Sequence, residues 1–258
     1  MVRQLALVTG ASAGIGRSIA ADLASRGYDI VGVGSSAKVE DLASELTQTV
    51  VHPVRADLST REGVDQVWRE VEALDRPLEV AALNAGRSLG GGFLDTDIEE
   101  ELVMIALNIT SQVLLAKHVT RRMSEQGHGG ILITSSLSAL TPTPYESIYG
   151  PTRAFMLSFA EGLREEMKEH GVTVTALLPG ATATDFHHSA GMDNTVFGNN
   201  DWKNDPGLVA RQGVDALMAG KDHVVGGDAK TRRSALLNRV LPDSVKARRF
   251  AKSSRPTP

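Results

Sequence analysis

A phenol and a permanent cation stand four residues apart in the segment YGPTR, at Tyr149 and Arg153. On a helix, this spacing places both side chains on one face. A phenol beside a fixed positive charge can act as a proton donor, because the charge stabilises the phenolate that is left behind. At about 4 Å and an effective dielectric of about 20, that charge contributes roughly 4 kcal/mol. The pair could equally be an exposed ring beside an exposed arginine.

The glycine-rich segment TGASAGIG, at residues 9–16, is a second pattern that can bind a ligand. Gly10, Gly14 and Gly16 allow a tight turn and a close approach of the ligand to the backbone. The segment follows an apolar run and opens an amphipathic one, which predicts a strand–turn–helix unit. The free N–H groups and the dipole of such a helix suit a pyrophosphate. In this context a dinucleotide site is favoured over a plain turn.

These side chains need a scaffold, and the chain predicts a doubly wound parallel sheet. Short, almost continuously apolar runs, typical of strands covered on both faces, alternate with longer amphipathic runs. Strands are expected over 4–10, 28–34, 50–57, 79–86, 129–136, 172–180 and 222–227. Helices are expected over 15–27, 39–48, 60–74, 95–127, 158–171 and 205–220. The alternation indicates one α/β fold of about seven strands with helices on both faces.

The 258 residues fit a single domain without an internal repeat or linker. Within it, residues 185–215 are expected to form a substrate lid, and 243–258 a basic C-terminal tail. From Lys230 onward the chain has nine Lys or Arg and one Asp. A solvated helix with a frayed end is favoured there over a binding patch for anions.

Composition argues against several classes of protein. The chain has no cysteine, which excludes disulfides and thiolate catalysis, and its net charge of −4 gives no bias toward nucleic acid. The fifteen-residue apolar run 102–116 is shorter than the roughly 20 residues that span a bilayer, so a buried helix is expected. No signal-peptide pattern is present, and a cytoplasmic location is expected. His187 and His188 are interpreted as surface residues without a metal.

Further motifs, in the right order and spacing, give the chain a resemblance to the short-chain dehydrogenase/reductase family over residues 5 to about 186. Besides the glycine turn, they are AD ending at Asp57, NAG at 84–86 and PGATAT at 179–184. The resemblance implies a Rossmann-type fold, a nicotinamide cofactor, a small carbonyl or alcohol substrate, and a homodimer or homotetramer. It implies cofactor contacts at Thr9, Gly10, Ser12, Gly14, Ile15, Gly16, Asp57, Leu58, Asn84, Ala85, Gly86, Pro179, Gly180, Thr182 and Thr184.

The same resemblance implies a catalytic set. Tyr149 takes the position of the acid/base, Ser136 that of a second donor to the oxyanion, and Asn108 that of the helix asparagine. Arg153 departs from the pattern, because the family has lysine there. A guanidinium keeps the charge, but it is larger and planar and cannot give up a proton near neutral pH. A working enzyme is the main hypothesis, and a catalytically impaired, NADP-binding regulatory protein is the alternative. Pro151 predicts an irregular helix start.

The choice of cofactor depends on the end of the second predicted strand. No carboxylate stands there to bind a ribose diol; Ser35, Ser36 and Lys38 offer hydroxyls and charge instead. This favours NADP over NAD, although the same residues also suit an ordinary helix cap and an exposed side chain.

An apolar substrate pocket is expected, which suits an aliphatic or aromatic carbonyl, although core packing explains each of its residues as well. The residues that could form it are Phe93, Leu137, Tyr145, Phe186, Met192 and Trp202.

Overall fold

A seven-stranded sheet forms the centre of the computed structural model, which describes residues 3–256. The strand order is β3-β2-β1-β4-β5-β6-β7, and all neighbouring pairs are parallel. The strands are β1 (Leu5–Thr9), β2 (Asp29–Gly34), β3 (Val51–Arg55), β4 (Leu78–Leu83), β5 (Gly129–Thr134), β6 (Val172–Pro179) and β7 (His223–Gly226). The predicted doubly wound sheet is confirmed. Because the direction of winding reverses between β1 and β4, a crevice opens at their carboxyl ends.

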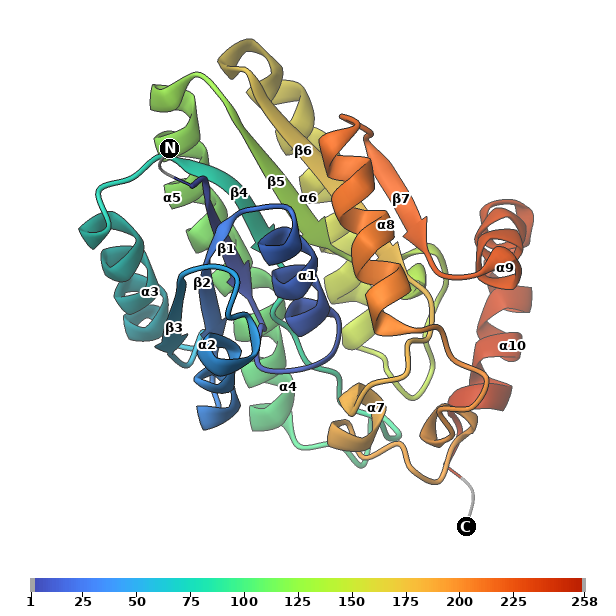
Figure 1. The fold of residues 1–258 in the computed structure, drawn as a ribbon. Coiled ribbons are helices and arrows are strands. Elements are labelled where there is room, and N and C mark those ends of the chain that lie inside the picture. Colours follow the sequence, from blue (N-terminus) through green and yellow to red (C-terminus); the bar gives the residue numbers. More distant parts are fainter. Residues whose placement is uncertain (1–2, 257–258) are drawn as a thin grey trace.

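Helices cover both faces of the sheet (Figure 1). On one face, α1 (Gly14–Ser25) and α8 (Pro206–Met218) pack against each other, and α2 (Asp41–Glu45) lies beside β3. The other face holds α3 (Arg61–Ala73), α5 (Ser111–Gln126) and α6 (Tyr149–Met167). Each face of the sheet therefore has its own helical layer.

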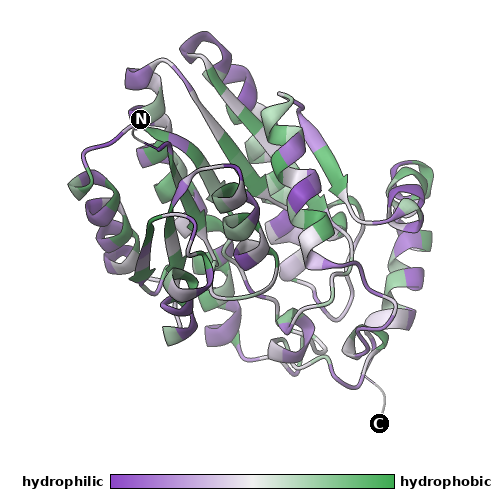
Figure 2. Ribbon diagram, viewed as in Figure 1, coloured by the Kyte–Doolittle hydropathy of each residue, from purple (hydrophilic) through white to green (hydrophobic). Residues whose placement is uncertain are grey.

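Two hydrophobic cores result from the alternation of side chains along the strands. On β1, Leu5 and Leu7 pack into the core with α3, α5 and α6, whereas Ala6 and Val8 pack into the core with α1 and α8. This is the period of two that a strand imposes. Figure 2 shows the apolar residues concentrated in the strands, with polar residues on the outer sides of the helices.

The helix expected over 95–127 consists of three parts. These are α4 (Ile98–Ile105), a π-helical turn at Ala106–Thr110 and α5. By length and mean hydropathy (1.5) the stretch Ile98–Gln126 could cross a membrane; within the fold, its α5 part packs against β4 and α3. The π turn, a feature frequent at functional sites, contains Asn108.

The predicted lid and tail both have defined structure. Residues 185–205 form a loop with α7 (Phe186–Ser189), whereas 206–215 belong to α8 in the helical layer. The tail forms α9 (Ala229–Val240) and α10 (Asp243–Ser254). Near its end, α10 packs back on the domain: the Ser254 hydroxyl donates to the Pro144 carbonyl (2.7 Å), and the ring of Phe250 lies 5.7 Å from that of Phe197. The basic C-terminal segment is therefore ordered up to residue 254, whereas a frayed end was expected.

Candidate active site

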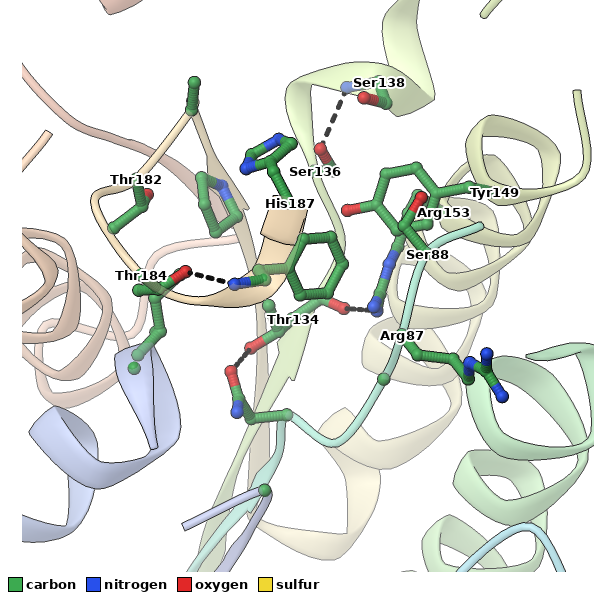
Figure 3. A pocket seen from close by; sticks show the side chains of 18 of the residues that line it. Arg87, Ser88, Thr134, Ser136, Ser138, Tyr149, Arg153, Thr182, Thr184 and His187 are labelled. Carbon is green, nitrogen blue, oxygen red and sulfur yellow. Dashed lines mark hydrogen bonds between the residues drawn. The ribbon is translucent and has the colours of Figure 1, made fainter. Parts of the chain in front are cut away.

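A cavity of about 730 Å³ opens at the carboxyl ends of the strands, where the loops after β1, β4, β5 and β6 meet (Figure 3). It brings together most of the residues that the sequence predicts for the site. The predicted residues that line it are Gly10, Ser12, Gly14, Ile15, Gly16, Ser35, Asp57, Leu58, Asn84, Ala85, Gly86, Ser136, Tyr149, Arg153, Pro179, Gly180, Thr182 and Thr184. Thr9, Ser36, Lys38 and Asn108 do not line it.

The turn after β1 forms a cradle that side chains would fill. Gly10 (φ 69°) and Gly14 (φ 55°) lie in the left-handed region, and a Cβ on Gly16 would come within 2.1 Å of the Gly10 carbonyl oxygen. Helix α1 begins at Gly14, and its N-cap residue Ala13 provides no side-chain cap. The N–H groups of the first turn are therefore left for a ligand, and a pyrophosphate fits them in charge and geometry.

Thr9 supports this cradle from inside the sheet. Its buried hydroxyl accepts hydrogen bonds from the backbone N–H groups of Asn84 (2.8 Å) and Ala85 (3.0 Å). The Asn84 side chain in turn donates to the Thr9 carbonyl (3.2 Å) and accepts from the Thr134 hydroxyl (3.1 Å). These bonds join the ends of β1, β4 and β5, so Thr9 positions the cavity wall without facing the cavity.

At the far end of the cavity, Asp57 is held by Ser59, whose backbone N–H and hydroxyl both donate to Oδ1 (2.9 and 2.7 Å). Ser35, at the end of β2, also lines the cavity. Ser36 and Lys38 are exposed outside it, so the geometry gives no support to their predicted contacts with the cofactor.

Two arginines outside the predicted set of site residues lie near this end. Arg17 Nη1 donates to the Ser12 carbonyl (2.9 Å), and Arg55 Nε donates to the Ser35 carbonyl (3.4 Å). Arg17 lies one turn into α1, and Arg55 pairs with Gly34 across β2 and β3. Sheet register was the signal that could have identified Arg55.

Tyr149, at the start of α6, and Ser136, in the loop after β5, both line the cavity (Figure 3). Tyr149 opens α6, which begins nine residues before the predicted start. Pro151 is the third residue of this helix, where a backbone N–H has no partner within the helix, so the expected irregular start does not occur. The Ser136 hydroxyl accepts from the N–H of Ser138 (3.1 Å), which leaves its own proton free to donate toward the cavity.

The Arg153 side chain is 3% exposed and lies over the Tyr149 ring, with Cζ 5.2 Å from the ring centroid. Nη1 donates to the Thr134 carbonyl (3.1 Å), and Nε has no hydrogen-bond partner. The guanidinium thus contacts the face of the ring as a cation–π pair and makes no hydrogen bond to the phenol oxygen. One face of α6 does hold both side chains, and both are buried, which excludes the interpretation as an exposed ring and arginine.

Gly86 makes room for the guanidinium. A Cβ on this residue would lie 2.0 Å from Arg153 Nη2 and 3.0 Å from Asn108 Oδ1. We therefore expect Gly86→Ala to lower the free energy of unfolding by about 1–3 kcal/mol through overpacking. In an Arg153→Met background, which removes the crowded group, the same change should cost clearly less. Chemical denaturation of the four proteins of this double-mutant cycle measures the difference. Equal costs in both backgrounds would show that the guanidinium does not fill this space.

Asn108 is linked to Tyr149 only through its neighbours. Its Oδ1 accepts from the N–H of Arg87 (2.9 Å), and its Nδ2 donates to the Arg87 carbonyl (2.9 Å) and to the Thr152 hydroxyl (3.0 Å). Thr152 donates in turn to the backbone carbonyl of Tyr149 (2.7 Å). The fully buried amide therefore fixes the loop after β4 against the first turn of α6 and has no direct contact with the Tyr149 hydroxyl.

Two titratable residues of the cavity were missed or misread in the sequence. His187, expected at the surface, lines the cavity and stacks on Phe197 (centroids 5.1 Å apart). Burial and the nearby Lys203 ammonium lower the pKa of His187 to about 4, so the ring is neutral at pH 7. Burial raises the pKa of Glu146 to about 7, against the opposite effect of a hydrogen bond from Ser88.

The apolar wall differs from the expected set. Leu137, Phe186 and Trp202 line the cavity, whereas Phe93, Tyr145 and Met192 do not. Phe93 is 59% exposed, Met192 packs beneath Gly90, and the Tyr145 hydroxyl accepts from Arg255 Nε (2.7 Å). Phe197 and Phe250, brought in by the loop before α8 and by α10, complete the wall.

Comparison with known proteins adds relatives. The family model for short chain dehydrogenase matches residues 4–195. An uncharacterized short-chain type dehydrogenase/reductase of Sinorhizobium fredii, y4eK, is 35% identical over 190 residues, which is 72% of this chain and 73% of the relative. The uncharacterized oxidoreductase YmfI of Bacillus subtilis is 30% identical over 188 residues, 71% of this chain and 76% of YmfI. A solved short-chain dehydrogenase from Sphingobium yanoikuyae, in complex with NADPH, superposes with a TM-score of 0.81 at 29% identity, covering 90% of this chain and 91% of that one.

Proposed function

Because the chain belongs to the short-chain dehydrogenase/reductase family, we propose that it transfers a hydride between a nicotinamide cofactor and a small carbonyl or alcohol substrate. The observation that supports this function best is the shared cavity: the Tyr149 phenol, the Ser136 hydroxyl and the Arg153 guanidinium line the same space as the glycine cradle. A dinucleotide bound in that cradle would supply the hydride. The chain's own groups then have to bind the carbonyl oxygen and protonate it.

In this proposal Tyr149 and Ser136 share the carbonyl oxygen. Hydride transfer to the carbonyl carbon leaves negative charge on that oxygen, and two hydroxyl donors stabilise it. The Tyr149 hydroxyl gives up its proton, and the permanent charge of Arg153 over the ring stabilises the phenolate that remains. In the oxidative direction the phenolate takes the proton back. Asn108 is a positioning residue, because it reaches Tyr149 only through Thr152.

Arg153 would have a second task, in holding the cofactor. Among the described residues its Nη2 has no hydrogen-bond partner, and this atom is not fully enclosed by protein. It is therefore accessible from the cavity, next to Gly86, and can donate to a ribose hydroxyl. The pyrophosphate would lie against the first turn of α1, and Asp57 would reach the adenine.

NADP is favoured over NAD in this proposal. The cavity wall at the end of β2 has Ser35 and no carboxylate, and the guanidinium groups of Arg17 and Arg55 bond to the carbonyls of Ser12 and Ser35. Arg17 also pairs with Glu45, so the positive charge that a 2′-phosphate would meet there comes mainly from Arg55. The NADPH bound to the Sphingobium yanoikuyae relative is consistent with this choice.

We expect Ser35→Asp to reverse the preference. A carboxylate at this position repels a 2′-phosphate and accepts hydrogen bonds from a ribose diol, so kcat/KM for NADPH should fall at least tenfold relative to NADH. Ser36→Asp, which adds the same charge on the exposed neighbour, should change the ratio far less. Steady-state kinetics with both cofactors measure it. Equal effects of the two variants would mean that the 2′-phosphate does not lie at Ser35.

A cytoplasmic homodimer or homotetramer is part of the proposal. On α4 and α6, Ile98, Leu102 and Phe155 are 57%, 49% and 43% exposed. Exposed apolar side chains of this size on neighbouring helices are typical of a protein–protein interface. Pairing of these helices across subunits would cover these side chains. Sedimentation velocity of the full chain gives the mass; a monomer at all concentrations would contradict this part.

The proposed function is tested by incubating the full chain with NADPH and a panel of ketones and aldehydes. We expect NADPH consumption together with an equal amount of product alcohol, detected by chromatography. A cofactor-binding regulatory protein without turnover would bind NADPH and form no alcohol from any member of the panel.

A further inference from the structure

A buried carboxyl group faces the cavity beside the proposed catalytic residues and has no part in the mechanism above. Glu146 lies three residues before Tyr149 and is 3% exposed. Its Oε1 accepts from the Ser88 hydroxyl at 2.6 Å, and Ser88 is itself 2% exposed. Figure 3 shows Ser88 at the end of the cavity where Tyr149 and Arg153 lie. The pair therefore belongs to the substrate end and not to the dinucleotide cradle.

The second carboxyl oxygen of Glu146 is unused. Among the described residues Oε2 has no hydrogen-bond partner, and it is not fully enclosed by protein. Oε2 is thus accessible, and the space that it can reach is the cavity. Burying a carboxyl group with half of its acceptors unsatisfied is costly unless a ligand completes the set.

The backbone around Glu146 is held in a fixed, unfavourable geometry. Tyr145 has φ 67°, in the left-handed region that non-glycine residues seldom adopt, and its carbonyl accepts from the N–H of Gly91 (2.9 Å). The next glycine back, Gly90, donates to Ala190 (2.9 Å), so the loop after β4, the segment before α6 and the lid meet here. These bonds aim Glu146 at the cavity.

The charges around the cavity decide which donor fits Glu146. Arg153, permanently charged, lines the same cavity and repels a ligand ammonium, whereas the low pKa of His187 keeps that ring neutral. Among residues 3–256, Glu146 has no ion-pair partner. A neutral hydroxyl is therefore the donor that suits Oε2. The rings of Phe186, Phe197 and Trp202 along the wall suit an aromatic or other apolar remainder.

We propose that Glu146, oriented by Ser88, is a specificity-determining residue that selects carbonyl substrates with a hydroxyl group close to the reacting carbonyl. In the oxidative direction the corresponding substrates are diols. The inference rests on the proposed function, because it assumes that the carbonyl is bound by Tyr149 and Ser136. It goes beyond that function because it names the substrate class and the side chain that recognises the substrate hydroxyl.

The test compares 2-hydroxyacetophenone with 2-methoxyacetophenone, which keeps the ring and the oxygen but has no donor. With the full chain and NADPH at pH 8, above the Glu146 pKa of about 7, the carboxylate is mostly ionised. Under these conditions kcat/KM should be about 10- to 100-fold higher for the hydroxyl compound, the range for one hydrogen bond to a charged acceptor. In Glu146→Gln, the amide oxygen can take the Ser88 bond and turn the NH2 group into the cavity. The hydroxyl-to-methoxy ratio should then fall to about 1 or below, with the larger change in KM.

Glu101→Gln is the matched control, because Glu101 is a buried carboxylate (5% exposed) bonded to Thr96 outside the cavity. It should keep the wild-type ratio. A wild-type ratio near 1, or a ratio that Glu146→Gln leaves unchanged, would overturn the inference while leaving carbonyl reduction intact. If no compound is reduced, the proposed function fails. The inference is then tested by the dissociation constants of the two ketones in the presence of NADP⁺: tighter binding of the hydroxyl compound, lost in Glu146→Gln, supports it, and equal binding overturns it.

Discussion

Tyr149→Phe should lower kcat by about a thousandfold while the dissociation constant of NADPH stays within roughly threefold of wild type. The substitution removes the proton that the nascent alkoxide needs, along with one of its two hydrogen bonds, and keeps the ring that Arg153 and Phe186 contact. Steady-state kinetics and a fluorescence titration with NADPH measure the two quantities. A small loss of kcat would mean that the proton comes from elsewhere.

Tyr145→Phe is the control for this variant. Tyr145 is the other phenol of the segment, four residues earlier, and its hydroxyl bonds to Arg255 outside the cavity. We expect kcat within about threefold of wild type and, at most, a small loss of thermal stability. Equal losses in the two variants would point to a disturbed segment 145–149 instead of a lost proton donor.

Arg153→Met should lower the single-turnover rate roughly a hundredfold at saturating NADPH. The guanidinium lies 5.2 Å from the ring centroid, and its loss leaves the forming phenolate without a neighbouring cation. Arg153→Lys keeps a charge and should retain at least a tenth of the wild-type rate. If both variants lose activity equally, shape and not charge is what matters at this position.

Arg164→Met controls for the loss of a guanidinium from the same helix. Arg164 bonds to the carbonyls of Val174, Gly220 and Lys221, away from the cavity. Its removal should lower the melting temperature and leave the single-turnover rate unchanged. The comparison separates an electrostatic effect on Tyr149 from a general weakening of α6.

The fold was predictable because its signals are local and repeated. Apolar runs and amphipathic runs alternate along the chain, and a sheet with two helical layers is the arrangement that buries both. The start of α6 was missed because Gly150 and Pro151 resemble helix breakers. In the first turn of a helix, a missing N–H and a flexible backbone cost little stability. Tertiary packing around Tyr149 therefore outweighs the low helix propensity of these two residues.

The site was predictable where motifs stand at the carboxyl ends of strands, since parallel strands bring those ends together. Three features were not. The direction of the Arg153 guanidinium depends on the space above Gly86. Glu146 is significant only because burial and Ser88 leave one oxygen facing the cavity. Phe250 reaches the wall from the last helix, and no local pattern reports a contact between α10 and the lid.

The most direct test of the proposed catalysis follows the hydride itself. NADPH with deuterium at the transferred position is mixed with an excess of the full chain and a hydroxyketone, and the product is analysed by mass spectrometry. The proposal predicts an alcohol with one deuterium at the former carbonyl carbon, formed in wild type and about a thousandfold more slowly in Tyr149→Phe. Tight binding of NADPH without any labelled alcohol would contradict it.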